Sequence, residues 1–282
     1  MNRLIINADD FGIHEEVNEA VRLAHEQGIL SSTSLLASGR AYEEAVAIAK
    51  RFPKLGIGIH LCLVGSLPPL SDPGEVPSLL ADDGLFPESY ATFIQKAYRG
   101  KINYEEVYRE LDRQMNKIMT SGLPITHVDS HQHLHVLPPV WRIVCSLMKK
   151  YGLHRLRLPR EAYCFKMLTA RPGRVLGRNG LTFLAEKAAR DLPALRFLST
   201  DHFWGMVDGG NMNSANLAYI LKQLPFGIHE IMMHPGRNKE LLSRRYAWHY
   251  HWDEELAALL SPAMKEILQK NRIMLITYGD LP

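Results

Sequence analysis

The sequence predicts one α/β domain in which mostly parallel strands form a barrel or a barrel-like sheet. Two observations support this prediction. Short apolar runs alternate with amphipathic segments over most of the 282 residues, which favours repeated β–α units. The apolar runs are nearly continuous, as in LIINA and IMLIT, and this is typical of strands buried on both faces of a parallel sheet. About seven such repeats in one chain favour a barrel.

Each predicted element follows from its local pattern. The candidate strands are Arg3–Ala8, Ser32–Leu36, Gly56–Leu61, Ile125–Asp129, Arg155–Leu158, Glu230–His234 and Arg272–Thr277. Apolar residues at helical spacing predict helices at Glu15–Glu26, Tyr104–Met119, from Val140 onward, and Asp253–Lys270. The Pro- and Gly-rich stretch Gly65–Pro87 is expected to be a long loop that takes part in binding. We expect one domain over residues 1–282, with an insertion around 162–198.

Composition narrows the class of protein. Hydrophobic residues make up 46% of the chain and charged residues 22%, and the net charge is only +3, so we expect no nucleic-acid partner. No apolar run is long enough to span a membrane, although peripheral contact with a membrane surface stays open. The cysteines Cys62, Cys145 and Cys164 form no CxxC pair, which favours a reducing, cytoplasmic location.

Two polar clusters follow strands near the N-terminus. Asp9 and Asp10 end the first strand, and neighbouring residues of a strand point to opposite faces, so one could bind a metal while the other approaches a substrate. An aspartate that caps the next helix is the alternative. His60 ends the apolar strand GIGIH, where a metal ligand and a hydrogen-bonded structural histidine are both open interpretations.

Four histidines crowd the middle of the chain. They are His127, His131, His133 and His135, and the last three would project to one side if the segment were extended. Neutral imidazoles grouped in this way bind divalent metals well. His234 closes a later strand before Pro-Gly, where it is either a site residue or a buried histidine that holds the turn.

Taken together, these clusters predict a metal-dependent hydrolase. One aspartate and two histidines would give three ligands and leave positions open for water and substrate. Such a metal polarises a carbonyl and acidifies its bound water. Asp9, adjacent to the ligand Asp10, would be the general base, and His234 would be the general acid for a leaving amine.

Four segments carry a resemblance to a known family: NADDFG, GIGIHLCL, THVDSHQHLHVLP and EIMMHPG. In order and spacing they resemble the motifs of the YdjC-like deacetylases, which include chitooligosaccharide deacetylases and deacetylases of hopanoid biosynthesis. The resemblance implies a distorted (β/α) TIM-like barrel and one divalent metal ion, Mg²⁺ or Zn²⁺, bound by Asp10, His60 and His131. It also implies removal of an N-acetyl group from an amino sugar, with Asp9 as base and His234 as acid.

The substrate is less closely defined by these motifs. His133, His135, Arg157 and Trp204 are candidate substrate-binding residues, and Arg157 is equally compatible with pairing to a carboxylate. Gln132 stands where the chitooligosaccharide branch commonly has histidine, so a soluble oligosaccharide and a glycolipid both stay open. The family resemblance also makes a homodimer an expectation. Two alternatives are another metal-dependent amidohydrolase and a non-catalytic metal- or carbohydrate-binding protein on the same scaffold; the Asp9/His234 pair favours the enzyme.

Overall fold

A curved parallel sheet forms the centre of the computed structural model, which describes residues 1–161 and 172–282. The strand order is β4-β3-β2-β1-β6-β5, and β7 pairs with the start of β1. All of these strand pairs are parallel. The strands are β1 (Arg3–Phe11), β2 (Ser32–Leu35), β3 (Gly56–Leu61), β4 (Ile125–Ser130), β5 (His202–Trp204), β6 (Ile228–Met233) and β7 (Met274–Leu275).

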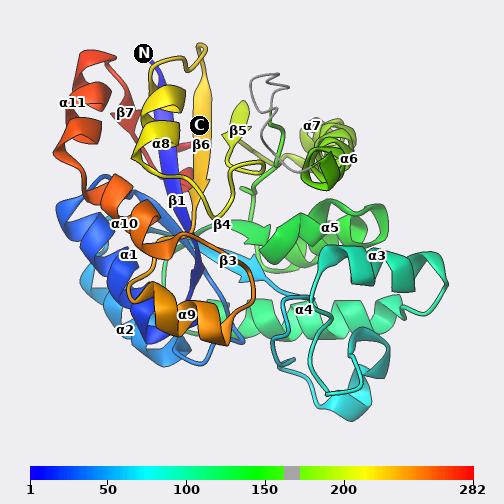
Figure 1. The fold of residues 1–282 in the computed structure, drawn as a ribbon. Helices are drawn as coiled ribbons and strands as arrows, with labels where there is room; N and C mark the ends of the chain where they lie inside the picture. Colours follow the sequence, from blue (N-terminus) through cyan, green and yellow to red (C-terminus); the bar gives the residue numbers. More distant parts are fainter. Residues whose placement is uncertain (162–171) are drawn as a thin grey trace.

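Helices surround this sheet on both sides, and both termini lie at the end of the sheet where β1 begins (Figure 1). Helices α1, α2 and α10 lie on one side of the sheet, and α3, α4 and α5 lie on the other. The helices are α1 (Glu15–Gln27), α2 (Tyr42–Arg51), α3 (Tyr90–Tyr98), α4 (Tyr104–Met119), α5 (Pro138–Lys150), α6 (Pro172–Ala189), α7 (Leu192–Leu195), α8 (Ser214–Leu221), α9 (Lys239–Arg245), α10 (Trp252–Leu260) and α11 (Pro262–Lys270).

The sheet approaches closure through single bridges instead of full strands. Leu156 forms a parallel bridge to Val128 at the edge of β4, and Arg155 forms another to Leu198. Glu161 bridges to Phe203 of β5 at the other edge. The predicted strand Arg155–Leu158 is therefore wrong as a strand, because its backbone makes only isolated bridges. The parallel architecture itself confirms the predicted barrel-like α/β fold.

Two other predictions need correction. The sequence predicts one helix over Asp253–Lys270, but the helix ends at Leu260 and α11 begins at Pro262. Proline at the first position of a helix is favourable, whereas inside a helix it removes a backbone hydrogen bond, so Pro262 starts a new helix. The three-residue strand β5 is absent from the predicted set, since so short a run carries little periodic signal.

Buried polar side chains of α4 hold the long loop that follows β3. Glu110 accepts backbone N–H groups of Leu70 and Ser71 at 3.0 and 2.9 Å, and Glu106 accepts that of Ser78 at 2.8 Å. The side-chain amide of Gln114 accepts a hydrogen bond from the backbone N–H of Cys62 and donates one to the Cys62 carbonyl, each at 2.8 Å. The loop contains the short 3₁₀ turns Pro73–Glu75 and Pro77–Leu79. Because its backbone is paired with side chains, the loop has a defined path beside the carboxyl end of β3.

The described part of the insertion expected at 162–198 consists of α6 and α7, while residues 162–171 lie outside the described residues. Among the residues that the structure describes, no helix has the length and apolar character needed to cross a membrane.

Candidate metal centre and active site

Three side chains meet at the carboxyl ends of the central strands. Asp10 lies near the end of β1, His60 lies in β3, and His131 follows β4 directly. Each is at most 3% exposed, and each offers a ligand atom within 4.8 Å of the other two. Asp10 Oδ1 lies 2.9 Å from His131 Nδ1 and 3.4 Å from His60 Nε2. The three residues that the motif resemblance implies as ligands therefore form one compact, buried donor set.

The backbone at the end of β1 separates the two neighbouring aspartates. Asp10 has φ +63°, a left-handed conformation that aspartate tolerates better than most residues. The register with β2 shifts at this point, between Ala8 and Phe11. As a result, Asp10 contacts the two histidines while Asp9 pairs with Arg157. The nearest partners of the two carboxylates therefore differ, although both lie within 4.0 Å of His60 Nε2.

Unpaired atoms show that the donor set fits a cation. Asp10 Oδ2 and the Nε2 atoms of His60 and His131 are buried without a hydrogen-bond partner. Buried polar atoms without partners are costly in a folded protein. A divalent ion would bind carboxylate oxygens and imidazole nitrogens of this kind as ligands, so the residues present suit a metal centre.

Asp129 orients His60 within this centre. Its Oδ1 lies 2.8 Å from His60 Nδ1, and its Oδ2 accepts a hydrogen bond from Ser34 at 2.6 Å. A carboxylate on Nδ1 leaves Nε2 available toward the metal position. Burial alone lowers the pKa of His60, but the nearby carboxylates of Asp129, Asp10 and Asp9 outweigh burial and raise it to about 10. The same negative field favours a cation between these groups.

Arg157 forms the centre of a buried charge network. Its guanidinium donates to both oxygens of Asp9 at 2.7 Å, to Asp129 Oδ2 at 2.9 Å and to Glu230 Oε1 at 2.8 Å. Glu230 in turn accepts a hydrogen bond from the Tyr278 hydroxyl at 2.5 Å. Burial opposes the charge of Arg157, but the three carboxylates together hold its pKa well above the ordinary value. The structure thus pairs Arg157 with carboxylates.

The histidine-rich segment does not have the predicted extended geometry. Residues His131–Val136 form a kinked 3₁₀ turn in which Gln132 and His133 have φ of +53° and +58°. The three histidines therefore do not share one side. His135 Nε2 must donate to the Arg157 carbonyl at 2.9 Å, since a carbonyl only accepts, and its Nδ1 accepts from the Ser130 hydroxyl at 2.6 Å. Both nitrogens of His135 are engaged inside the protein.

His234 directly follows β6, the strand that pairs with β1. Its ring is 5% exposed, and its Nδ1 has no hydrogen-bond partner. Burial lowers the pKa of His234, although the carboxylates of Asp9 and Asp10 raise it in part. Its backbone N–H donates to Glu255 Oε2 at 2.5 Å, and Glu255 Oε1 accepts from Met212 N at 2.9 Å. Glu255, which the sequence analysis missed, fixes the turn that carries His234.

A titration prediction follows for Glu255. Burial raises its pKa to about 7, above the ordinary value of 4.5. The folded protein therefore retains this proton between about pH 4.5 and 7 while the unfolded chain loses it. The contribution of Glu255 to the free energy of unfolding should fall as the pH rises through that window.

Urea unfolding at several pH values should show wild type losing stability relative to Glu255→Gln as the pH rises. Glu266→Gln, which removes an exposed carboxylate of α11, is the control; a similar pH trend in both variants would contradict the assignment.

A cavity of about 320 Å³ opens above this centre. Asp9, His131, His133 and His234 all line it, together with Trp248 and Tyr250. Trp204 is not among its lining residues: it is 8% exposed, and its indole N–H donates to His229 at 3.3 Å. A larger cavity between α5, α6 and α7 lies apart from these residues, and its described lining contains neither a histidine nor a pair of carboxylates.

Comparisons with known proteins identify the family of the chain. The family model described as YdjC-like protein matches residues 3–270. The chain belongs to the YdjC-like family. This YdjC-like chain is 30% identical to a carbohydrate deacetylase of Brevibacillus brevis, with 99% of each protein covered. It is 36% identical to a chitooligosaccharide deacetylase of Serratia marcescens over 56% of this chain and 60% of that protein.

A solved structure supports the fold. The crystal structure of EF3048 from Enterococcus faecalis V583, a protein provisionally named for cellobiose-phosphate cleavage, is 26% identical to this YdjC-like chain. The match covers 99% of this chain and 98% of that one, with a TM-score of 0.76. Membership of the YdjC-like family and the distorted TIM-like barrel, both expected from the four motifs, are confirmed.

Proposed function

We propose that this chain is a divalent-metal-dependent carbohydrate deacetylase that hydrolyses the N-acetyl amide of an amino sugar and releases acetate. One observation carries the proposal: Asp10, His60 and His131 form a buried set of possible metal ligands, and His131 lines the same cavity as Asp9 and His234. A protein that only binds a metal or a sugar has no need of an additional carboxylate and imidazole at the same cavity. The names of its relatives, carbohydrate deacetylase and chitooligosaccharide deacetylase, support the same substrate class.

In the proposed reaction, each residue has one task. Asp9 accepts a proton from the attacking water, and its two oxygens are held in place by Arg157 at 2.7 Å. His234 donates a proton to the nitrogen of the leaving amine. The lowered pKa of His234 makes its protonated form a stronger acid. His133, which also lines the cavity, has a buried Nδ1 without a partner and is available to a substrate polar group.

Asp10, His60 and His131 would hold the metal. When bound there, a divalent ion polarises the amide carbonyl and lowers the pKa of water. Two imidazoles and one carboxylate match Zn²⁺ better than Mg²⁺, because Mg²⁺ prefers oxygen ligands. The amide bond to be cleaved would lie between Asp9 and His234, since both line the same cavity.

The first test is acetate release by the purified protein. We expect hydrolysis of N-acetylglucosamine compounds to fall at least about a hundredfold after chelation, because the metal supplies several kcal/mol of the barrier reduction. Separate addition of Zn²⁺, Mn²⁺ or Mg²⁺ should restore acetate release, and the restored rates rank the three ions. The panel should contain N-acetylglucosamine, its β-1,4-linked oligomers and a glycolipid with a terminal N-acetylglucosamine. This set separates an oligosaccharide enzyme from one that acts on glycolipids.

The failure of this test is also informative. Acetate release that resists chelation would exclude metal dependence. A protein that retains its metal but releases no acetate from any of these sugars would favour the non-catalytic binding protein on the same scaffold. Asp10→Asn and His131→Ala should lose both metal and turnover in the same assays, because each removes a proposed ligand.

A further inference from the structure

An alternating aromatic run lies next to the metal centre. In the sequence Tyr-Ala-Trp-His-Tyr-His-Trp, residues 246–252, every second side chain is aromatic. We call these residues the aromatic segment; it connects α9 to α10. Its rings contact one another, with centroid distances of 4.9 Å for Tyr246–Trp248, 5.7 Å for Trp248–Tyr250 and 5.1 Å for Tyr250–Trp252. The four rings therefore form one continuous aromatic cluster.

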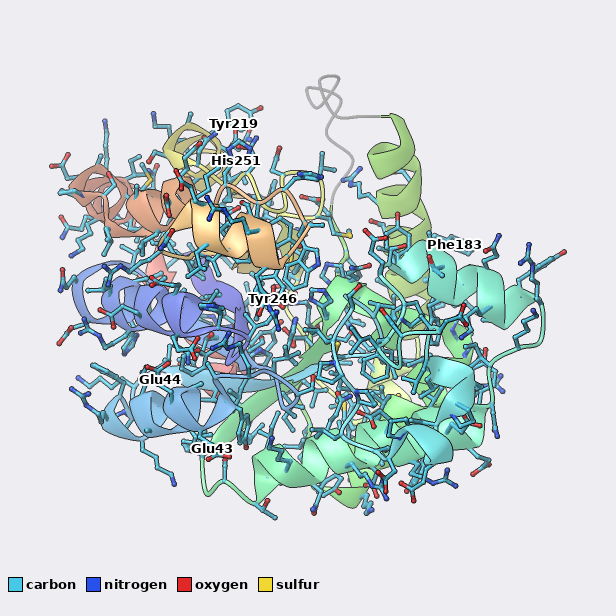
Figure 2. All side chains as sticks on the ribbon, turned by 60° about the horizontal axis from the view of Figure 1, so that its bottom comes forward. Glu43, Glu44, Phe183, Tyr219, Tyr246 and His251 are labelled. Carbon is cyan, nitrogen blue, oxygen red and sulfur yellow. The ribbon has the colours of Figure 1, made fainter. Side chains whose placement is uncertain are left out.

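The two ends of the aromatic segment anchor it in the protein. The Tyr246 hydroxyl donates to the Ile13 carbonyl at 3.1 Å, and the Trp252 side chain is fully buried. The His251 backbone N–H donates to the Gly210 carbonyl at 2.7 Å. Figure 2 shows Tyr246 near the centre of the molecule and His251 closer to its outer edge. Anchors at both ends define the path of the backbone that carries the two central rings.

The two central rings, by contrast, are only half-buried and line the cavity. The Trp248 ring lies 4.7 Å from the ring of His131, and the Tyr250 ring lies 4.5 Å from that of His234. One aromatic wall thus extends from a proposed metal ligand to the proposed general acid. A partly exposed indole in such a place leaves apolar surface in contact with water, and a ligand with an apolar face would remove that cost.

We propose that Trp248 and Tyr250 form a pyranose-stacking subsite for the sugar ring that carries the acetyl group. The inference rests on the proposed function, since the acetamide must reach the metal centre. A pyranose presents one face of C–H groups, which packs on an aromatic ring, and rigid Trp and Tyr side chains lose little entropy on binding. The wall touches His131 and His234, so the ring on it is the one directly attached to the reacting amide. Trp248 contributes most, because indole has the larger face.

Kinetics of Trp248 variants test the subsite. Trp248→Leu should raise KM about tenfold for both N-acetylglucosamine and its β-1,4-linked dimer, with kcat within about twofold of wild type. Trp248→Tyr should retain most of the affinity, because it keeps an aromatic face. Trp141→Tyr is the control: its indole donates to Asp191 and lines the separate cavity between α5, α6 and α7, so KM should not change.

Binding without turnover separates this inference from the proposed function. In an Asp9→Asn background, titration with the β-1,4-linked dimer should change the tryptophan fluorescence, and Trp248→Leu should remove that change. This result would support the subsite even if no acetate were released. Three results would overturn it: an unchanged KM in Trp248→Leu, a KM effect confined to the dimer, or a loss of kcat and bound metal at constant KM. The last would mean that Trp248 positions His131 instead of binding sugar.

Discussion

Asp9→Asn is expected to reduce kcat by about 10²- to 10⁴-fold while the protein keeps its metal and its fold. The amide of the substituted side chain cannot accept a proton from the attacking water as the carboxylate does. The metal should stay because Asp10, His60 and His131 are the proposed ligands. Asp9 forms a second possible ligand group with His60 and Asp129, but Arg157 already pairs with both oxygens of Asp9. The fold should stay because Arg157 retains two carboxylate partners, Asp129 and Glu230.

Acetate release and metal content, measured on the same preparation, check this expectation. Asp10→Asn is the matched comparison, since it makes the same chemical change one residue along the chain. It should lose metal and activity together. If Asp9→Asn lost its metal while its circular dichroism and unfolding midpoint matched wild type, Asp9 would belong to the metal centre and another group would be the base. Full activity of Asp9→Asn would exclude it as a base altogether.

The parts of this site that could be predicted from sequence are those with local signals. Asp9, Asp10, His60 and His234 each end an apolar run, and carboxyl ends of parallel strands meet at one edge of the sheet. The structure brings all four to that edge. Helix α4 begins and ends where its apolar spacing predicts, at Tyr104 and Met119. Local periodicity and motif position were sufficient for these elements.

The remainder depends on tertiary contacts that no local pattern encodes. The kink at Gln132 and His133 has left-handed backbone angles, so alternation along the chain could not assign sides to the histidines. The role of Glu255 depends on a turn that lies 21 residues away in sequence. Trp248 and Tyr250 belong to a segment in which every second residue is aromatic. Such alternation is also typical of a strand that packs on the core, so the sequence does not show that the two rings face a site. Only the cavity shows that these two rings face the site.

The buried network around Arg157 gives the second large expected effect. Arg157→Met should lower the free energy of unfolding by about 3–5 kcal/mol, because Asp9, Asp129 and Glu230 would remain buried without their shared cation. Urea unfolding monitored by circular dichroism measures the change. Arg113→Met is the control: its ion pair with Glu75 lies at the surface, where such pairs contribute little to stability.

A double variant separates lost charge compensation from lost packing. Glu230→Gln removes one of the three carboxylates while keeping an oxygen that accepts the Tyr278 hydroxyl. If uncompensated charge dominates, Arg157→Met combined with Glu230→Gln should be more stable than Arg157→Met alone. If the loss of stability comes mainly from the lost side-chain packing of Arg157, the double variant should be no more stable than the single one. An Arg157→Met protein as stable as wild type would show that the three carboxylates are protonated or hydrated in the fold, and that Asp9 owes its position to other contacts.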